Sequence, residues 1–159
     1  MRMYIKAGNV KYNYNGNDIK STYQLVDGKD YSLRKGIDSL FVIPLDVEKK
    51  TLVKNERNPN DETIMGRVCD KIVHQLDEEG IITSNIYWFD TEIYSNPDNY
   101  RNVKFSFKNV YISEAQSPWL QFIYDGNSFS IKYTATKIEE KALDDSEFRL
   151  PNLPQKNGF

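Results

Sequence analysis

The sequence has little of the chemistry on which most enzymes and secreted proteins depend. It contains one cysteine, Cys69, and one histidine, His74, in 159 residues. A lone cysteine excludes an internal disulfide and is compatible with a reducing compartment. No apolar run approaches the roughly 20 residues of a membrane-spanning helix, and the opening MRMYIKAGNVKY lacks the apolar stretch of a signal peptide. We therefore expect a soluble intracellular protein that does not associate with a membrane.

Motifs for catalysis and cofactor binding are also missing. Cysteine and histidine are not clustered, which excludes a zinc site of the usual composition. His74 is expected to be exposed on a helix, and no G-x-S-x-G motif supplies it with a nucleophile. No glycines follow the G-x-x-x-x-G-K-S/T pattern of a phosphate-binding loop. The sequence thus predicts no catalytic residue, no metal, no cofactor and no small-molecule substrate.

One carboxylate pattern keeps an enzyme among the alternatives. Asp38 precedes a predicted strand that leads to Glu48 and Lys50, which imitates the D…E-x-K arrangement of metal-dependent nucleases. In such enzymes two carboxylates hold magnesium, and the lysine helps to orient the attacking water. Pro44 interrupts the intervening strand, and a solvated hairpin turn explains the same residues. The nuclease therefore remains a second alternative.

The residues that are present favour a folded domain with a core of its own. Apolar residues make up 39% of the chain, and this modest content includes 11 Tyr, 8 Phe and 2 Trp. Each buried aromatic ring removes a large area from water. A chain of this length can bury roughly 70% of its unfolded surface, so it can form a core without disulfides or metal.

The charges are distributed unevenly along the chain. Residues 1–57 carry 11 Lys or Arg against 7 Asp or Glu, whereas residues 58–159 carry 10 against 16. Nucleic-acid binders normally present a dense basic face that neutralises phosphates, and no segment here is that basic. We expect a basic protein surface as partner, and no direct binding of nucleic acid.

The apolar pattern predicts an α+β fold in a single domain, residues 1–147, with a loosely held tail at 148–159. Short hairpins are expected over residues 1–57, and a four-stranded meander follows over 81–135, where apolar and polar residues alternate. The N-terminal hairpins and the C-terminal meander are expected to form an antiparallel sheet packed on one main helix, residues 59–79.

Individual signals support these elements. Asn58 is a good N-cap, Pro59 suits the first helical position, and Gly80 is a suitable stop. The apolar residues of the helix recur every four positions, at Ile64, Val68, Ile72 and Leu76. Asn15-Gly16 predicts a tight hairpin turn, and Val103, Phe105 and Phe107 predict a strand that ends near Ile112.

The residues best suited to recognition are aromatic and acidic. Tyrosine and tryptophan at half-exposed positions are common anchors of protein interfaces, and acidic clusters speed the encounter with a basic partner. Capping of sheet edges and ordinary solubilising surface are equally good explanations for any one of these residues. The candidate partner-binding residues are Asp77, Glu78, Glu79, Tyr94, Tyr100, Trp119, Glu139, Glu140, Asp144 and Asp145.

Three features point to a known family. They are the opening M-x-M-Y-I-K-A, the chain length, and a composition rich in Lys, Asn, Ile and Tyr without an enzyme motif. Across its whole length the chain resembles the small anti-CRISPR proteins of phages and mobile elements that act on type II-A Cas9, and it is most similar to inhibitors of staphylococcal-type Cas9. The family has no diagnostic motif, so the resemblance assigns no role to any residue.

The resemblance implies a stoichiometric inhibitor in the cytoplasm of a bacterial host. Such a protein binds the Cas9–guide RNA complex, with the HNH domain as one docking site, and blocks DNA cleavage without catalysis. The first alternative is a phage or plasmid accessory protein with a structural or regulatory protein-binding role.

Overall fold

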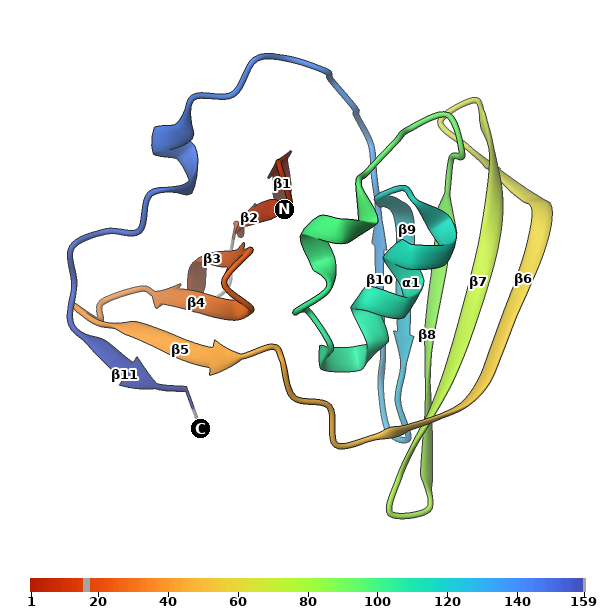
Figure 1. Cartoon of the computed structure of the whole chain (residues 1–159), viewed down its shortest axis with the longest axis horizontal. Coiled ribbons are helices and arrows are strands. Elements are labelled where there is room, and N and C mark those ends of the chain that lie inside the picture. The colour runs from red at the N-terminus through yellow and green to blue at the C-terminus, as the bar shows by residue number, and fades with distance from the viewer. Residues whose placement is uncertain (16–17, 159) are drawn as a thin grey trace.

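The computed structural model describes residues 1–15 and 18–158, which form two β-sheets with the helical segments between them (Figure 1). The first sheet has the strand order β1-β2-β3-β4-β5-β11, and the second has the order β10-β9-β8-β7-β6. The chain therefore has the predicted α+β fold in its coarse form, with sheets that are mainly antiparallel.

Hairpins from the N-terminal part of the chain build most of the first sheet. Its strands are β1 (Arg2–Lys6), β2 (Asn9–Asn13), β3 (Ile19–Leu25), β4 (Lys29–Arg34), β5 (Leu40–Pro44) and β11 (Gln155–Asn157). The first five strands pair antiparallel in chain order. The predicted hairpin over β2 and β3 is present, and its Asn15-Gly16 turn lies partly outside the described residues.

The second sheet is built from two long hairpins and one shorter one. Its strands are β6 (Thr51–Ile64), β7 (Arg67–Glu78), β8 (Ile81–Phe89), β9 (Trp119–Asp125) and β10 (Ser130–Thr134). All neighbouring pairs are antiparallel. One face of this sheet packs on the helical segments and the first sheet, and we call it the inner face; the opposite one is the outer face.

The predicted main helix over 59–79 is wrong, because this part of the chain is the β6–β7 hairpin. A spacing of four residues fits a helix, but it is also a multiple of the two-residue period of a strand. Ile72 and Leu76 are indeed buried together on one face of β7, whereas Val68 is 57% exposed. Met65 and Gly66 form the turn, with φ angles of 54° and 76°, which is the backbone of a tight hairpin.

The strand predicted to run from Val103 to about Ile112 is also wrong. Two short 3₁₀ segments, η1 (Pro97–Tyr100) and η2 (Phe105–Phe107), lead into the α-helix α1 (Lys108–Ala115). Ser106 and Phe107 have consecutive φ angles of 54° and 56°, far from the negative φ angles of a regular strand. The alternation of apolar residues there reflects burial of Val103 beside a half-exposed Phe105, and it does not define a sheet face.

The main core lies where the two sheets and α1 meet. Tyr12 comes from the first sheet, Tyr87 and Phe89 from the second, and Tyr111 from the helix. The Tyr87 and Tyr111 rings stack with centroids 4.1 Å apart, and Phe89 meets Tyr111 edge to face at 6.0 Å. Aromatic pairs in these arrangements add to the free energy gained by burying their area, so this cluster fixes α1 between the layers.

The C-terminal part of the chain returns to the first sheet. From β10 it passes through the 3₁₀ turn η3 (Asp145–Phe148), and β11 then pairs parallel to β5 (Figure 1). Phe148 is 92% buried. Within residues 148–159, which were predicted as a loosely held tail, Gln155–Asn157 form β11 and pair with β5. Among the described residues no helix is long and apolar enough to span a membrane.

Candidate partner-binding surface

The three predicted aromatic anchors differ in accessibility. Tyr94 is 69% exposed in the loop after β8, and Trp119 is half-buried at the start of β9. Tyr100 is only 3% exposed and belongs to the main core, where burial raises the pKa of its hydroxyl. Tyr94 and Trp119 can therefore meet a partner, and Tyr100 cannot in this conformation.

The acidic residues Asp77, Glu78 and Glu79 lie at the β7–β8 turn. The Asp77 carboxylate accepts a hydrogen bond from the backbone N–H of Gly80 at 2.7 Å, and Glu78 pairs with Lys50 at 3.4 Å. Glu79 has a φ angle of 54° within the turn. In Figure 1 this turn is at the bottom of the second sheet, away from the segment that follows β10.

The second acidic run is divided between two environments. Glu139 pairs with Lys137 at 2.7 Å, and Glu139 and Glu140 are both exposed in the segment that follows β10. Asp144 caps η3 by accepting the backbone N–H of Ser146 at 2.8 Å. Asp145 pairs with Lys6 of β1 at 2.7 Å, so its charge is partly compensated by the first sheet.

The structure brings part of the predicted set to one end of the second sheet. The backbone N–H of Ser95, next to Tyr94, donates to the carbonyl of Gln116, three residues before Trp119, at 2.7 Å. The chain leaves β10 beside the start of β9, because the N–H of Ala135 donates to the carbonyl of Leu120. Tyr94 and Trp119 therefore share this end of the sheet, whereas the segment that carries Glu139 and Glu140 leads to the first sheet, where Lys141 lies over the Tyr4 ring.

An exposed group of apolar side chains runs down from this end along strands β9 and β10. Trp119 lies 6.4 Å from Tyr133, and Tyr124 lies 5.5 Å from Phe129, both measured between ring centroids. Phe129 is 57% exposed and Ile131 is 39% exposed. We call these five residues the β10 edge surface. β10 pairs only with β9, so its other side is an unpaired strand edge among the described residues.

Reasoning from the sequence identified only Trp119 of this surface. Phe129, Ile131 and Tyr133 alternate with polar residues, a pattern that is typical of a buried sheet face. Because the last strand of a meander has one neighbour, its inward side chains are only partly covered. The position of this strand at the end of the predicted meander could therefore have indicated that its apolar side chains are partly exposed.

A polar network lies where the first sheet meets α1. Lys108, the first residue of α1, donates to the side-chain oxygen of Gln24, and Gln24 is the cross-strand neighbour of Asp30. The ammonium group lies 5.9 Å from the ring centroids of both Tyr12 and Tyr100. Burial lowers the pKa of Lys108 to about 8 and raises that of Asp30 to about 6, and in each case the other charge opposes the shift.

The residues of the nuclease alternative have structural partners of their own. The Glu48 carboxylate accepts the backbone N–H groups of Lys49 and Lys50, both at 2.9 Å, and also that of Ser106. Lys50 pairs with Glu78, and Asp38 is exposed in the loop between β4 and β5. In the part of the chain that the structure describes, no three His, Cys, Asp or Glu side chains are placed to hold a metal ion. These contacts favour a structural role for Glu48.

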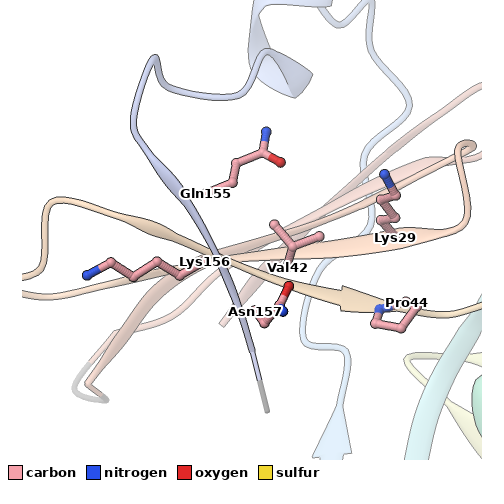
Figure 2. A pocket seen from close by; sticks show the side chains of 6 residues that line it. All are labelled: Lys29, Val42, Pro44, Gln155, Lys156 and Asn157. Carbon is pink, nitrogen blue, oxygen red and sulfur yellow. The ribbon is translucent and has the colours of Figure 1, made fainter.

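A shallow depression of about 310 Å³ lies over β4, β5 and β11 (Figure 2). Val42 forms its floor, and Lys29 and Lys156 extend away from it in different directions. The charges of the two lysines therefore do not converge on one point, and the depression is not organised for a small anionic ligand.

Comparison of the chain with protein-family models, with curated proteins and with solved structures found no match.

Proposed function

We propose that this chain is a stoichiometric binding protein that acts without making or breaking a covalent bond. The observation that carries the proposal is the β10 edge surface, where exposed Ile131 lies on a strand with one free side and exposed Phe129 immediately precedes that strand. Such an edge accepts an extended segment of another protein as an additional strand. Backbone hydrogen bonds would supply affinity, and the aromatic side chains would anchor the partner.

The partner that we propose is a Cas9 nuclease bound to its guide RNA, which the chain would inhibit. Support comes from the resemblance at the opening M-x-M-Y-I-K-A and in overall composition. Glu139 and Glu140 are exposed in the segment that follows β10, and they would supply negative charge to the partner-binding side of the chain. Cas9 holds its nucleic acids in basic channels, and opposite charge accelerates association with such surfaces. Docking on the HNH domain would prevent DNA cleavage.

The test is a plasmid-cleavage assay with purified staphylococcal-type Cas9–guide complex and increasing amounts of the chain. Inhibition should saturate near one chain per Cas9, and it should weaken as salt is raised. The double variant Phe129→Ser/Ile131→Lys should weaken binding at least tenfold. The matched control is Val26→Ser/Val47→Lys, since these two side chains are similarly exposed, at 47% and 52%, outside the proposed surface.

Each outcome bears on a separate part of the proposal. Equal inhibition by both double variants would exclude the β10 edge as the docking site. Full cleavage at a large excess of the native chain would exclude Cas9 inhibition. Turnover of DNA by the chain alone with magnesium, lost in Glu48→Gln, would overturn the non-catalytic role.

A further inference from the structure

The outer face of the second sheet carries a row of five side chains with an acid at one end and a base at the other. Glu56 of β6 is opposite Val73 of β7, which is opposite Ile86 of β8. Ile86 is in turn opposite Ile123 of β9, and Ile123 is opposite Lys132 of β10. Directly opposed residues of neighbouring strands share a face, so the row spans the whole sheet.

The centre of this row is apolar and accessible. Val73, Ile86 and Ile123 are half-buried, although they occupy three adjacent central strands. The helical segments and the first sheet lie on the inner face. The end of β6 folds over one end of the outer face, where Asp61 accepts a hydrogen bond from the indole of Trp88 and Ile64 packs with Trp88 and Leu120. Ile86 and Ile123 border this covered end. Lys132 is exposed, and the Glu56 side chain is 44% exposed. An apolar centre with a charged rim is the usual anatomy of a protein interface.

The order of the charges makes the row complementary to itself. If a second copy packs face to face about a two-fold axis parallel to β8, each β6 lies over the other copy's β10. Glu56 of each copy then meets Lys132 of the other, and Ile86 meets its own counterpart. In the next row Lys54 would meet Ser130 of the other copy and Asp125 would meet Gln75, so this row adds polar contacts without like charges. Within one copy Glu56 also contacts Lys54 at 2.5 Å, so each cross-copy pair would join an existing ion pair.

The size of the open part of the face suits a weak pair that forms at high concentration. Beside the covered end, five strands about 4.8 Å apart, over about five residues each at roughly 3.3 Å per residue, present on the order of 400 Å². A standard interface buries about 800 Å² on each partner. Two sheets can pack in this way with about 10 Å between them, as in a β-sandwich.

We propose that two copies of this chain form a symmetric dimer through the outer faces of their second sheets. The Glu56–Lys132 pairs set the register of the two copies, and the three apolar residues between them supply the buried area. The proposal is independent of the β10 edge surface, because Ile131 and Tyr133 lie on the inner face and Lys132 lies on the outer face of the same strand.

Charge reversal at the two ends of the row tests the proposal without disturbing the core. The molar mass of the native chain, measured by light scattering and sedimentation, should reach twice the 18.6 kDa of one chain as concentration rises. Glu56→Lys and Lys132→Glu should each weaken the dimer at least tenfold, because each places like charges opposite one another. An equimolar mixture of these two variants should form a heterodimer, and the double variant E56K/K132E should dimerise with itself.

The control reverses two exposed charges away from the second sheet, in Lys20→Glu/Asp38→Lys, with Lys20 on β3 and Asp38 in the β4–β5 loop, and should leave the dimer unchanged. A native chain that stays monomeric up to about 0.2 mM would overturn the proposal. A dimer that withstands both single reversals would place the interface elsewhere and would overturn it as well. Circular dichroism of each variant checks that the sheets remain folded, so a loss of mass cannot be assigned to unfolding.

Discussion

His74 and Tyr87 lie side by side on the inner face of the second sheet, with ring centroids 5.7 Å apart and planes inclined at 72°. The His74 side chain is fully buried, and neither of its ring nitrogens has a hydrogen-bond partner among the described residues. Burial without a partner disfavours the charged imidazolium, and it lowers the pKa of His74 to about 4.

The first prediction is that acid weakens the fold through His74. The unfolded chain takes up this proton near pH 6.5 and the folded chain near pH 4, so stability falls as pH drops through that window. The total loss is on the order of 3 kcal/mol, from about 1.4 kcal/mol for each unit of pKa difference. His74→Leu should remove this contribution, and urea unfolding of both proteins at pH 7 and pH 4.5 measures it.

Asp30 titrates in the opposite sense over part of the same range. Burial raises its pKa from 3.8 to about 6, so its contribution to stability falls as pH rises through that interval. The free energy of unfolding is therefore compared between the native chain and His74→Leu at each pH, because the contribution of Asp30 is the same in both proteins. The same free-energy difference at both pH values would show that His74 does not titrate in this window.

The second prediction concerns the Met65–Gly66 turn. Gly66 has a φ angle of 76°, and no atom lies within 4 Å of the position that a β-carbon would take. Gly66→Ala should therefore destabilise the fold by about 1 kcal/mol, through backbone conformation alone. Gly66→Asn should cost less, because asparagine tolerates this conformation. Thermal unfolding compares the two variants, and equal losses would contradict the conformational explanation.

The third prediction concerns the link between the first sheet and α1. Lys108→Met removes the hydrogen bond to Gln24 and should destabilise the fold by about 2 kcal/mol at pH 7.5. The cost should shrink at pH 5, where Asp30, with its pKa of about 6, is mostly protonated. Asp30→Asn/Lys108→Met should recover part of the loss, because it no longer buries a carboxylate without its cation.

Chemical denaturation at the two pH values measures these differences. Lys104→Met is the control, since this nearby lysine is exposed. A pH-independent cost of Lys108→Met would indicate lost packing of its methylene chain, and it would argue against coupling to Asp30.

The fourth prediction concerns the return of the chain to the first sheet. Phe148 is 92% buried, so Phe148→Ala should destabilise the fold by about 3 kcal/mol. Phe105 is 48% exposed, and Phe105→Ala should change stability by less than about 0.5 kcal/mol. Hydrogen exchange in the Phe148 variant should also speed up at the amides of β5. Similar melting temperatures for the two variants would mean that the η3 segment contributes little to the fold.

The sequence predicted the hairpins of the first sheet and most of the meander, because alternation and turn residues agree locally there. It failed at the β6–β7 hairpin, where Asn58 and Pro59 imitate a helix start and the four-residue spacing suits both structures. Pairing of β7 with both β6 and β8, which local propensity does not show, decides between them. It also missed α1, whose eight residues show no amphipathic pattern, because this helix is fixed by packing of Tyr111 between the layers.

The candidate surface was predicted only in part for a similar reason. Sequence identifies residue types suited to recognition, but exposure depends on which strand is at an edge and on what covers it. Tyr100 and Tyr94 are indistinguishable by type, yet one is in the core and the other is in water. Asp145 could not be recognised as compensated, because its partner Lys6 is far away in the chain.

The parallel pairing of β11 with β5 has a consequence for biosynthesis. Gln155 lies opposite Leu40, so the first sheet gains its final strand only after more than a hundred further residues have been translated. Until then β5 presents bare N–H and C=O groups to the crowded surroundings of the ribosome, although β1 to β4 can already be in place. The nascent chain can therefore pair with a neighbouring polypeptide at β5, and synthesis of the last segment closes this edge.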